Sequence, residues 1–187
     1  AIIKLSPKFS YIKRINNDVI EVGAATLDKT LSRFCKDNSI AGFEFLSCIP
    51  GSVGGGIRMN SGCYGDEISK LLLSIKIIDF DGNVRELSRD KIKFLYRGCD
   101  LPESLIILSA NFKCEKGNSN LIQEKINEYT QRKKSSQPSQ IKTCGSTFKN
   151  TEENKAWKLI KSSDCETKSF GKASISKKHC NFFVNNG

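Results

Sequence analysis

Apolar residues recur in short runs separated by polar turns, and their spacing predicts a chain that mixes strands with helices. The clearest pattern is a long apolar run at 71–80, followed by Asp81-Gly82, which is typical of a hairpin turn, and by a return strand at 84–87. Further strands are expected at 1–5, 19–22, 105–114, 173–176 and 181–184, with a strand edge at 145–149.

Helical spacing appears in four places. After Thr26, a plausible N-cap, the apolar residues Leu27, Leu31, Phe34 and Cys35 fall on one face of a helix that ends near residue 38. A second helix is predicted at 120–134, with one apolar face, a polar far face and a basic last turn. Shorter helices are predicted at 154–161 and, beginning near Ser88, through Ile92 and Phe94.

Half of the chain's 14 glycines lie between residues 42 and 65. Pro50-Gly51 favours a turn there, since proline fixes φ and the glycine that follows is free. Two interpretations stay open: a tight turn between packed elements, or a loop in which Ser52 and the N–H groups after it line an anion. The spacing matches neither a dinucleotide-binding nor a Walker loop.

Composition narrows the classes of function. The net charge of +10 and a pI near 9.2 favour an anionic partner. Eight cysteines without C-x-x-C spacing and a single histidine, His179, predict no metal site, and the cysteines are expected to be reduced cytoplasmic thiols. No apolar run approaches the ~20 residues that span a membrane, so we expect no membrane association.

Two sequence motifs in the glycine-rich stretch are similar to those of a known protein family. I-P-G-S-V-G-G, followed by M-N-S-G-C-Y-G, resembles the flavin-binding loop of the UDP-N-acetylenolpyruvoylglucosamine reductases, the MurB family. The resemblance implies FAD as cofactor and NADPH as hydride donor. The residues that it implies for cofactor binding are Ile49, Pro50, Gly51, Ser52, Gly54, Gly55, Asn60, Ser61 and Gly62.

Tyr96-Arg97 lies where this family has Y-R, and the resemblance implies that Arg97 stabilises the enolate form of the substrate's carboxylate. By itself, a Tyr-Arg pair most often packs and forms salt bridges, although an arginine fork also suits a carboxylate. The family usually has serine two residues later, where this chain has Cys99.

A second block, R-K-K-S-S-Q-P followed by C-G-S-T-F-K-N, is similar to the family's substrate-domain motif. There the serine donates a proton to carbon, and Ser146 occupies that place. Arg132, Lys149 and Asn150 are the implied contacts to the sugar nucleotide and its diphosphate. Thr151 stands where the family usually has proline.

A third block, A-W-K-L-I and then K-H-C-N-F-F-V-N, also resembles the family, although most of its residues are typical of core packing. The resemblance implies an α+β fold, with part of a two-lobed FAD-binding domain (vanillyl-alcohol-oxidase-like) at 1–115 and a partial substrate-binding domain at 116–187. The family's first flavin loop and its late glutamate are not in the sequence. We therefore expect a segment of a cytoplasmic, monomeric reductase. This segment is expected to be inactive alone, and the sequence leaves open whether it retains FAD.

Two other classes of function remain open on the residues. A related flavin-dependent oxidase would share the flavin loop, but the G-S-T-F-K-N block argues against it. A basic nucleic-acid-binding module would show interleaved basic and aromatic residues, and this pattern is absent. The function that the resemblance implies is reduction of UDP-N-acetylglucosamine enolpyruvate to UDP-N-acetylmuramate in peptidoglycan synthesis, with the UDP-sugar and NADPH as partners and no nucleic acid.

Overall fold

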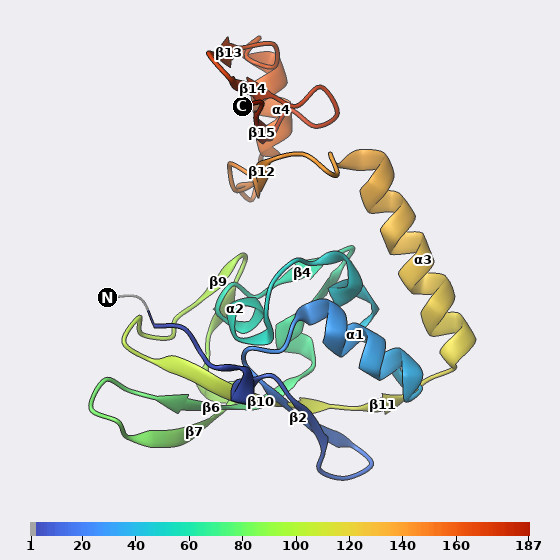
Figure 1. Cartoon of the computed structure of the whole chain (residues 1–187), viewed down its shortest axis with the longest axis vertical. Helices are drawn as coiled ribbons and strands as arrows, with labels where there is room; N and C mark the ends of the chain where they lie inside the picture. Colours follow the sequence, from blue (N-terminus) through green and yellow to red (C-terminus); the bar gives the residue numbers. More distant parts are fainter. Residues whose placement is uncertain (1–2) are drawn as a thin grey trace. The chain divides into compact units, whose positions relative to one another are not determined.

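The computed structural model describes residues 3–187, and the chain forms two compact units, Ala1–Thr130 and Gln131–Gly187. Both units combine helices with antiparallel sheets, so the fold is α+β, as predicted (Figure 1). The helix α3, Ser119–Ser136, begins in the first unit and ends in the second.

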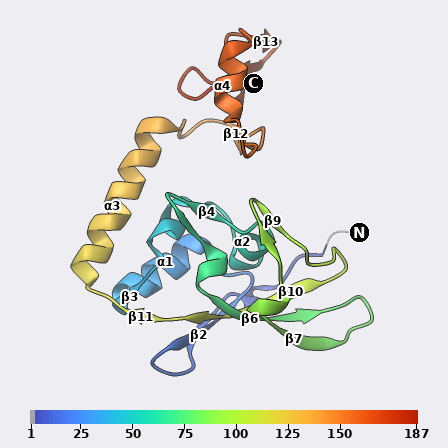
Figure 2. The ribbon, with the colours of Figure 1, turned by 180° about the vertical axis from the view of Figure 1, so that it is seen from behind.

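A five-stranded antiparallel sheet, in the order β1-β2-β10-β6-β7, forms the base of the first unit. Its strands are β1 (Ile12–Arg14), β2 (Val19–Gly23), β6 (Leu72–Ile78), β7 (Val84–Ser88) and β10 (Ile106–Lys113). The predicted hairpin is confirmed, because β6 and β7 pair in register across the Asp-Gly turn. The helices α1 (Asp28–Asp37) and α2 (Val53–Arg58) cover the same face of this sheet (Figures 1 and 2).

Shorter elements complete the first unit. The short strands are β3 (Ile40–Ala41), β4 (Gly62–Cys63), β5 (Asp66–Glu67), β8 (Phe94–Leu95), β9 (Gly98–Cys99) and β11 (Glu115–Lys116). The 3-10 turns are η1 (Pro7–Phe9), η2 (Glu44–Cys48), η3 (Ile68–Lys70) and η4 (Arg89–Lys91). Between them, the fully buried side chains of Phe43, Phe45 and Phe112 fill the centre of the core.

The second unit is built on a four-stranded antiparallel sheet, in the order β12-β15-β14-β13. Its strands are β12 (Thr143–Ser146), β13 (Ser169–Phe170), β14 (Ala173–Ile175) and β15 (Phe182–Asn185). The helix α4, Ala156–Ser162, confirms the helix predicted at 154–161.

The helix α1 begins one residue later than its sequence suggested. Leu27, not Thr26, is the N-cap, because the Thr26 hydroxyl donates to the carbonyl of Tyr11 (3.0 Å). Leu31 and Cys35 are buried as predicted, whereas Leu27 is 58% exposed. The helical period was therefore correct, and the competing hydrogen bond explains the shifted start.

Three other predictions need correction. Residues 3–5 of the strand predicted at 1–5 are not in a strand, and its first two residues lie outside the described range. The helix predicted from Ser88 is only the 3-10 turn η4, after which Ile92 is extended and β8 begins. The strand edge expected at 145–149 ends at Ser146.

Candidate functional site

The glycine-rich stretch is not a free loop, because it contains the six-residue helix α2. Glycine disfavours helix, so tertiary contacts must hold this one. The N–H groups of Val53 and Gly54 donate to the carbonyls of Thr26 and Ala24, both at 2.9 Å. These two N–H groups are therefore not available to line an anion, which corrects one interpretation of the stretch.

The glycines of α2 divide between two sides of the helix. A Cβ atom at Gly54 would lie 2.9 Å from that of Ala24, so this position requires glycine for close packing. One at Gly56 would lie 3.4 Å from the Asp28 carboxylate, an ordinary van der Waals contact, so α2 is packed against protein on this side as well. The Cβ position of Gly55, in contrast, is exposed and meets only the Ser52 hydroxyl, at 3.6 Å. The outer side of α2 thus offers accessible backbone with small side chains, which suits a flat ligand.

Asn60 lies two residues after the end of α2 and connects three segments. Its side chain is 2% exposed, and its backbone adopts a positive φ of 41°. Its Nδ2 donates to the Leu95 carbonyl (3.2 Å), and its Oδ1 accepts the N–H of Ser69 (3.4 Å). Asn60 is therefore engaged by the protein itself.

Gly62, next along the stretch, is held close to β5. A Cβ atom there would lie 2.3 Å from the carbonyl oxygen of Asp66, so a larger residue would force the two strands apart. Its own carbonyl accepts a hydrogen bond from Nη2 of Arg97 (2.8 Å). The structure thus brings the predicted catalytic arginine to the predicted cofactor segment.

Arg97 occupies the turn between β8 and β9, with a positive φ of 57°. Its guanidinium also lies over the ring of Tyr96, 5.0 Å from the centroid. Both contacts leave the arginine partly exposed at the rim of the glycine-rich stretch. An arginine suits a carboxylate, because its planar guanidinium presents a fork of N–H donors.

Asp28 is a feature that the sequence did not reveal. The residue is fully buried, neither carboxylate oxygen has a hydrogen-bond partner within residues 3–187, and burial raises its pKa to about 6. Its carboxylate lies against the backbone of Gly51 and Gly56, and its N–H donates to the Gly51 carbonyl (3.1 Å). A first-turn aspartate is ordinarily a solvated cap residue, which is why its pattern gave no signal.

The part of α3 that belongs to the first unit docks on the far end of the glycine-rich stretch. The rings of Tyr129 and Tyr64 stack with centroids 4.7 Å apart. Lys125 lies 3.9 Å from Glu44 and 3.7 Å from Asp66, and these carboxylates raise its pKa although burial opposes the change. The predicted apolar face of α3 is therefore a docking face, in which the lysine adds a charged contact.

In the second unit, Ser146 is exposed at the end of β12. The turn after it is fixed by Asn181, whose buried side chain accepts the N–H of Phe148 (3.0 Å) and donates to the carbonyl of the same residue (2.9 Å). The Asn181 carbonyl also accepts the N–H of Thr147 (2.8 Å). Asn181 thus holds the predicted proton donor in a defined turn, a role that its core-like sequence pattern did not indicate.

The predicted substrate residues of the second unit have different settings. Oδ1 of Asn150 accepts the N–H of Ala156 (3.0 Å), so Asn150 helps begin α4. Lys149 is exposed and lines a cavity of about 430 Å³ beside α4. Arg132 is exposed on the last turns of α3.

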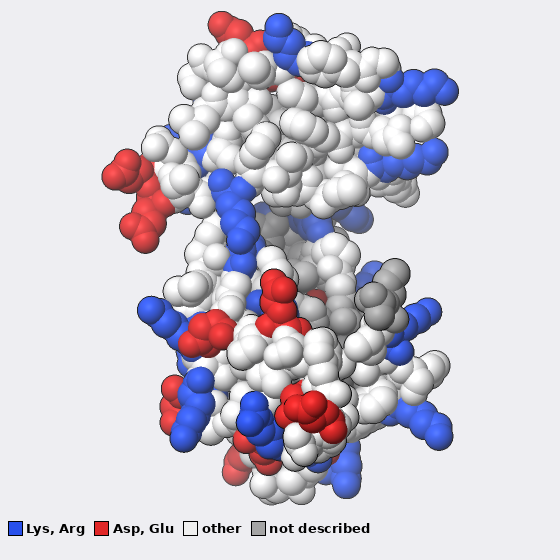
Figure 3. Space-filling view, turned by 90° about the vertical axis from the view of Figure 1, so that its left-hand side faces the viewer, with Lys and Arg blue, Asp and Glu red and all other residues white. Residues whose placement is uncertain are grey.

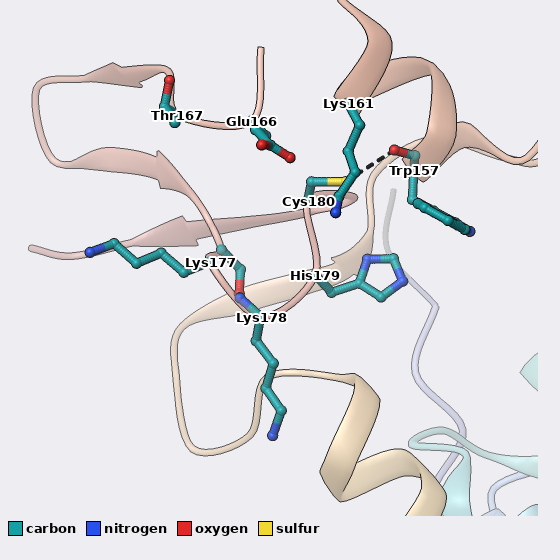
Figure 4. A pocket seen from close by; sticks show the side chains of 9 residues that line it. Trp157, Lys161, Glu166, Thr167, Lys177, Lys178, His179 and Cys180 are labelled. Atoms are coloured by element: carbon teal, nitrogen blue, oxygen red, sulfur yellow. Dashed lines mark hydrogen bonds between the residues drawn. The ribbon is translucent and has the colours of Figure 1, made fainter. Parts of the chain in front are cut away.

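A second cavity of this unit, of about 500 Å³, lies beside α4 and β14 (Figure 4). Lys161, Lys177 and Lys178 line it, with Glu166 as the acidic member. The Cys180 thiol points to the carbonyl of Trp157 (3.2 Å), and burial lowers the pKa of the neighbouring His179. Sequence reasoning assigned none of these lysines.

Surface charge, cysteine thiols and possible metal ligands point to no further functional site among the described residues. On the face in Figure 3, basic and acidic side chains of the first unit are interspersed, without a continuous basic surface. All eight cysteines are free thiols, and no cluster of three or more metal-ligating side chains forms within residues 3–187. Over the same range, no helix is both long and apolar enough to cross a membrane.

Two family models match the chain: the FAD binding domain over residues 1–88, and the C-terminal domain of UDP-N-acetylenolpyruvoylglucosamine reductase over residues 137–187. A protein of that name from Pelagibacter ubique is 50% identical over 187 residues, which are 98% of this chain and 62% of that protein. Another from Rickettsia bellii is 46% identical over 185 residues, which are 99% of this chain and 61% of that protein. The chain belongs to this reductase family.

A solved relative agrees with this assignment. The crystal structure of the reductase (MurB) from Thermus caldophilus matches with a TM-score of 0.82 and 30% identity, over 89% of this chain and 62% of that one. The chain spans about three-fifths of the length of the MurB relatives that it matches. The predicted family and the α+β fold with a flavin-domain match are confirmed.

Proposed function

We propose that this chain forms the central part of a UDP-N-acetylenolpyruvoylglucosamine reductase. Residues 1–115 would belong to the FAD-binding domain and residues 116–187 to the substrate-binding domain. The names of the relatives and the match of residues 1–88 to the FAD binding domain support this assignment. The observation that supports the proposal most directly is the hydrogen bond from Arg97 to Gly62, because it places the arginine beside the predicted cofactor segment within one unit.

FAD, when bound, would supply the redox chemistry that links NADPH to the enolpyruvyl double bond. The accessible residues Gly51, Ser52 and Gly55 fit such a group, because a ring can approach their backbone without meeting a large side chain. The other predicted cofactor residues lie close to these in the sequence: Ile49, Pro50, Gly54 and Ser61. Because Asn60 and Gly62 are buried, they would support the cofactor site by fixing the conformation of the segment.

Arg97 would hold the substrate's carboxylate and stabilise the negative charge that develops on it as an enolate. Its fork geometry suits this task, since two N–H groups can face one carboxylate. Ser146 would then protonate the carbon, and the turn fixed by Asn181 would give its hydroxyl a constant direction. Arg132, Lys149 and Asn150 would contact the sugar nucleotide and its diphosphate.

The proposal also covers the product, the partners and the location. The product would be UDP-N-acetylmuramate, and the partners would be NADPH and the UDP-sugar. The protein would be a monomer in the cytoplasm. On the face of the first unit seen in Figure 3, basic and acidic side chains are interspersed, which does not favour a nucleic-acid-binding module there. No observation favours an oxidase either.

Reconstitution with FAD tests the proposal. The purified chain is mixed with FAD, the excess is removed, and the visible spectrum is recorded; retained flavin bands are expected. Gly55→Phe should abolish retention, because it fills the outer side of α2, whereas Thr30→Phe on the exposed side of α1 should not. If a chain extended to the full length of the relatives also stays colourless, the proposal is refuted.

A further inference from the structure

The turn that carries Arg97 is attached to the glycine-rich stretch at two points. One is the hydrogen bond from the guanidinium of Arg97 to the Gly62 carbonyl (2.8 Å). The other is the bond from Nδ2 of Asn60 to the carbonyl of Leu95, the β8 residue that pairs with Gly98 across the turn (3.2 Å). Both attachments begin within three consecutive residues, Asn60 to Gly62.

Asn60 is suited to this place by its backbone and by its amide. A positive φ of 41° is tolerated by asparagine better than by most residues with a side chain. The amide supplies a donor for Leu95 and an acceptor for the Ser69 N–H at the same time. An aspartate of the same shape would keep the acceptor and would place a negative oxygen against the Leu95 carbonyl.

The side chain of Asn60 has little capacity left for a ligand. It is 2% exposed, and both ends of the amide already meet protein groups. The accessible surface of the same stretch lies elsewhere, at Gly51, Ser52 and Gly55. Asn60 therefore differs in kind from the residues that a flavin can touch directly.

We propose that Asn60 is a positioning residue, which fixes the β8–β9 turn so that the Arg97 guanidinium is held ready for a carboxylate ligand. The identity of that ligand as an enolpyruvyl carboxylate rests on the proposed function. The positioning itself does not, because the contacts exist within the chain alone.

NMR of the isotope-labelled chain tests the positioning without any ligand. In Asn60→Asp, the Nε–H group of Arg97 should lose the heteronuclear NOE of an ordered side chain. The matched control is Asn38→Asp, which removes an Nδ2 bond of the same kind, to the carbonyl of Phe34 (2.9 Å), at the end of α1. Asn38→Asp should leave Arg97 ordered, so a loss of order in Asn60→Asp would not be a general result of removing an Nδ2 hydrogen bond.

A second measurement needs no variant. In the unmodified chain, the side-chain amide protons of Asn60 should exchange with water at least about tenfold more slowly than those of the exposed Asn17. Equal exchange rates would overturn the proposal, even if Asn60→Asp did not fold. So would an Arg97 that stays fully ordered in a folded Asn60→Asp protein.

FAD reconstitution separates this inference from the proposed function. If Asn60→Asp mobilises Arg97 but retains flavin as the unmodified chain does, the positioning role is supported. If it loses flavin while Arg97 stays ordered, Asn60 is a cofactor contact and the inference is wrong. If neither protein retains flavin, only the proposed function is in question, and the NMR result still decides the positioning.

Discussion

The buried carboxyl of Asp28 gives the most quantitative prediction. Its pKa is raised from the ordinary 3.8 to about 6 because burial disfavours the charged form. Below pH 3.8 the group is neutral in both the folded and the unfolded chain. As the pH rises, the unfolded chain releases the proton first, so the free energy of unfolding falls until about pH 6 and then stays lower.

The size of this loss follows from the pKa difference. At 1.36 kcal/mol per pKa unit, a rise from 3.8 to about 6 corresponds to about 3 kcal/mol above pH 6. Asp28→Asn removes the ionisation and keeps the shape. The variant should therefore match the unmodified chain near pH 4 and exceed its free energy of unfolding by up to about 3 kcal/mol at pH 8.

Urea unfolding followed by far-ultraviolet circular dichroism at pH 4 and pH 8 measures the difference. Tryptophan fluorescence is less suitable, since Trp157 belongs to the second unit. The matched control is Asp37→Asn on the same helix, whose side chain is 55% exposed and pairs with Lys36 at 3.0 Å. A surface pair contributes about 0–1 kcal/mol, so this control should change little. An Asp28→Asn advantage that is the same at both pH values would refute the reasoning.

Three further predictions concern packing and thiols. Gly62→Ala should lower the free energy of unfolding by about 1–3 kcal/mol in urea, because its Cβ would lie 2.3 Å from a carbonyl oxygen, whereas Gly55→Ala, whose Cβ finds room, should be neutral or slightly stabilising. Tyr129→Ala should cost about 3 kcal/mol in the same assay, since it removes a buried ring that stacks on another tyrosine, and an unchanged midpoint would contradict the docking of α3. Alkylation followed by mass spectrometry should modify the exposed Cys144 first and the buried Cys35 last, because burial raises the pKa of the Cys35 thiol; the reverse order would contradict this burial.

The sequence anticipated those elements that local pattern determines. The β6–β7 hairpin follows from an apolar run and an Asp-Gly turn, and α1 and α3 follow from their helical periods. The helix α2 could not be anticipated, because glycine disfavours helix and the first N–H groups of α2 are held by the carbonyls of Ala24 and Thr26, which are distant in sequence.

The same distinction applies to the candidate site. Resemblance to the family pointed to Arg97 and Ser146, but no spacing could have placed Arg97 beside Gly62, 35 residues away. Asp28 was missed for the opposite reason: its position in the first turn of a helix is ordinarily a solvated one, and its burial against Gly51 and Gly56 is a contact between segments distant in sequence. Contacts between segments distant in sequence carry this information.

The glycines of α2 also bear on how the chain can be altered. Glycine-rich stretches are commonly regarded as flexible linkers in which a tag or a protease site can be inserted. Here Gly54 packs directly against the backbone of Ala24, so a residue inserted at this point would push α2 away from the segment that precedes α1. The turn between β6 and β7 is the opposite case: it is exposed, and Asp79 ties it internally through Asn83, so engineered insertions belong there.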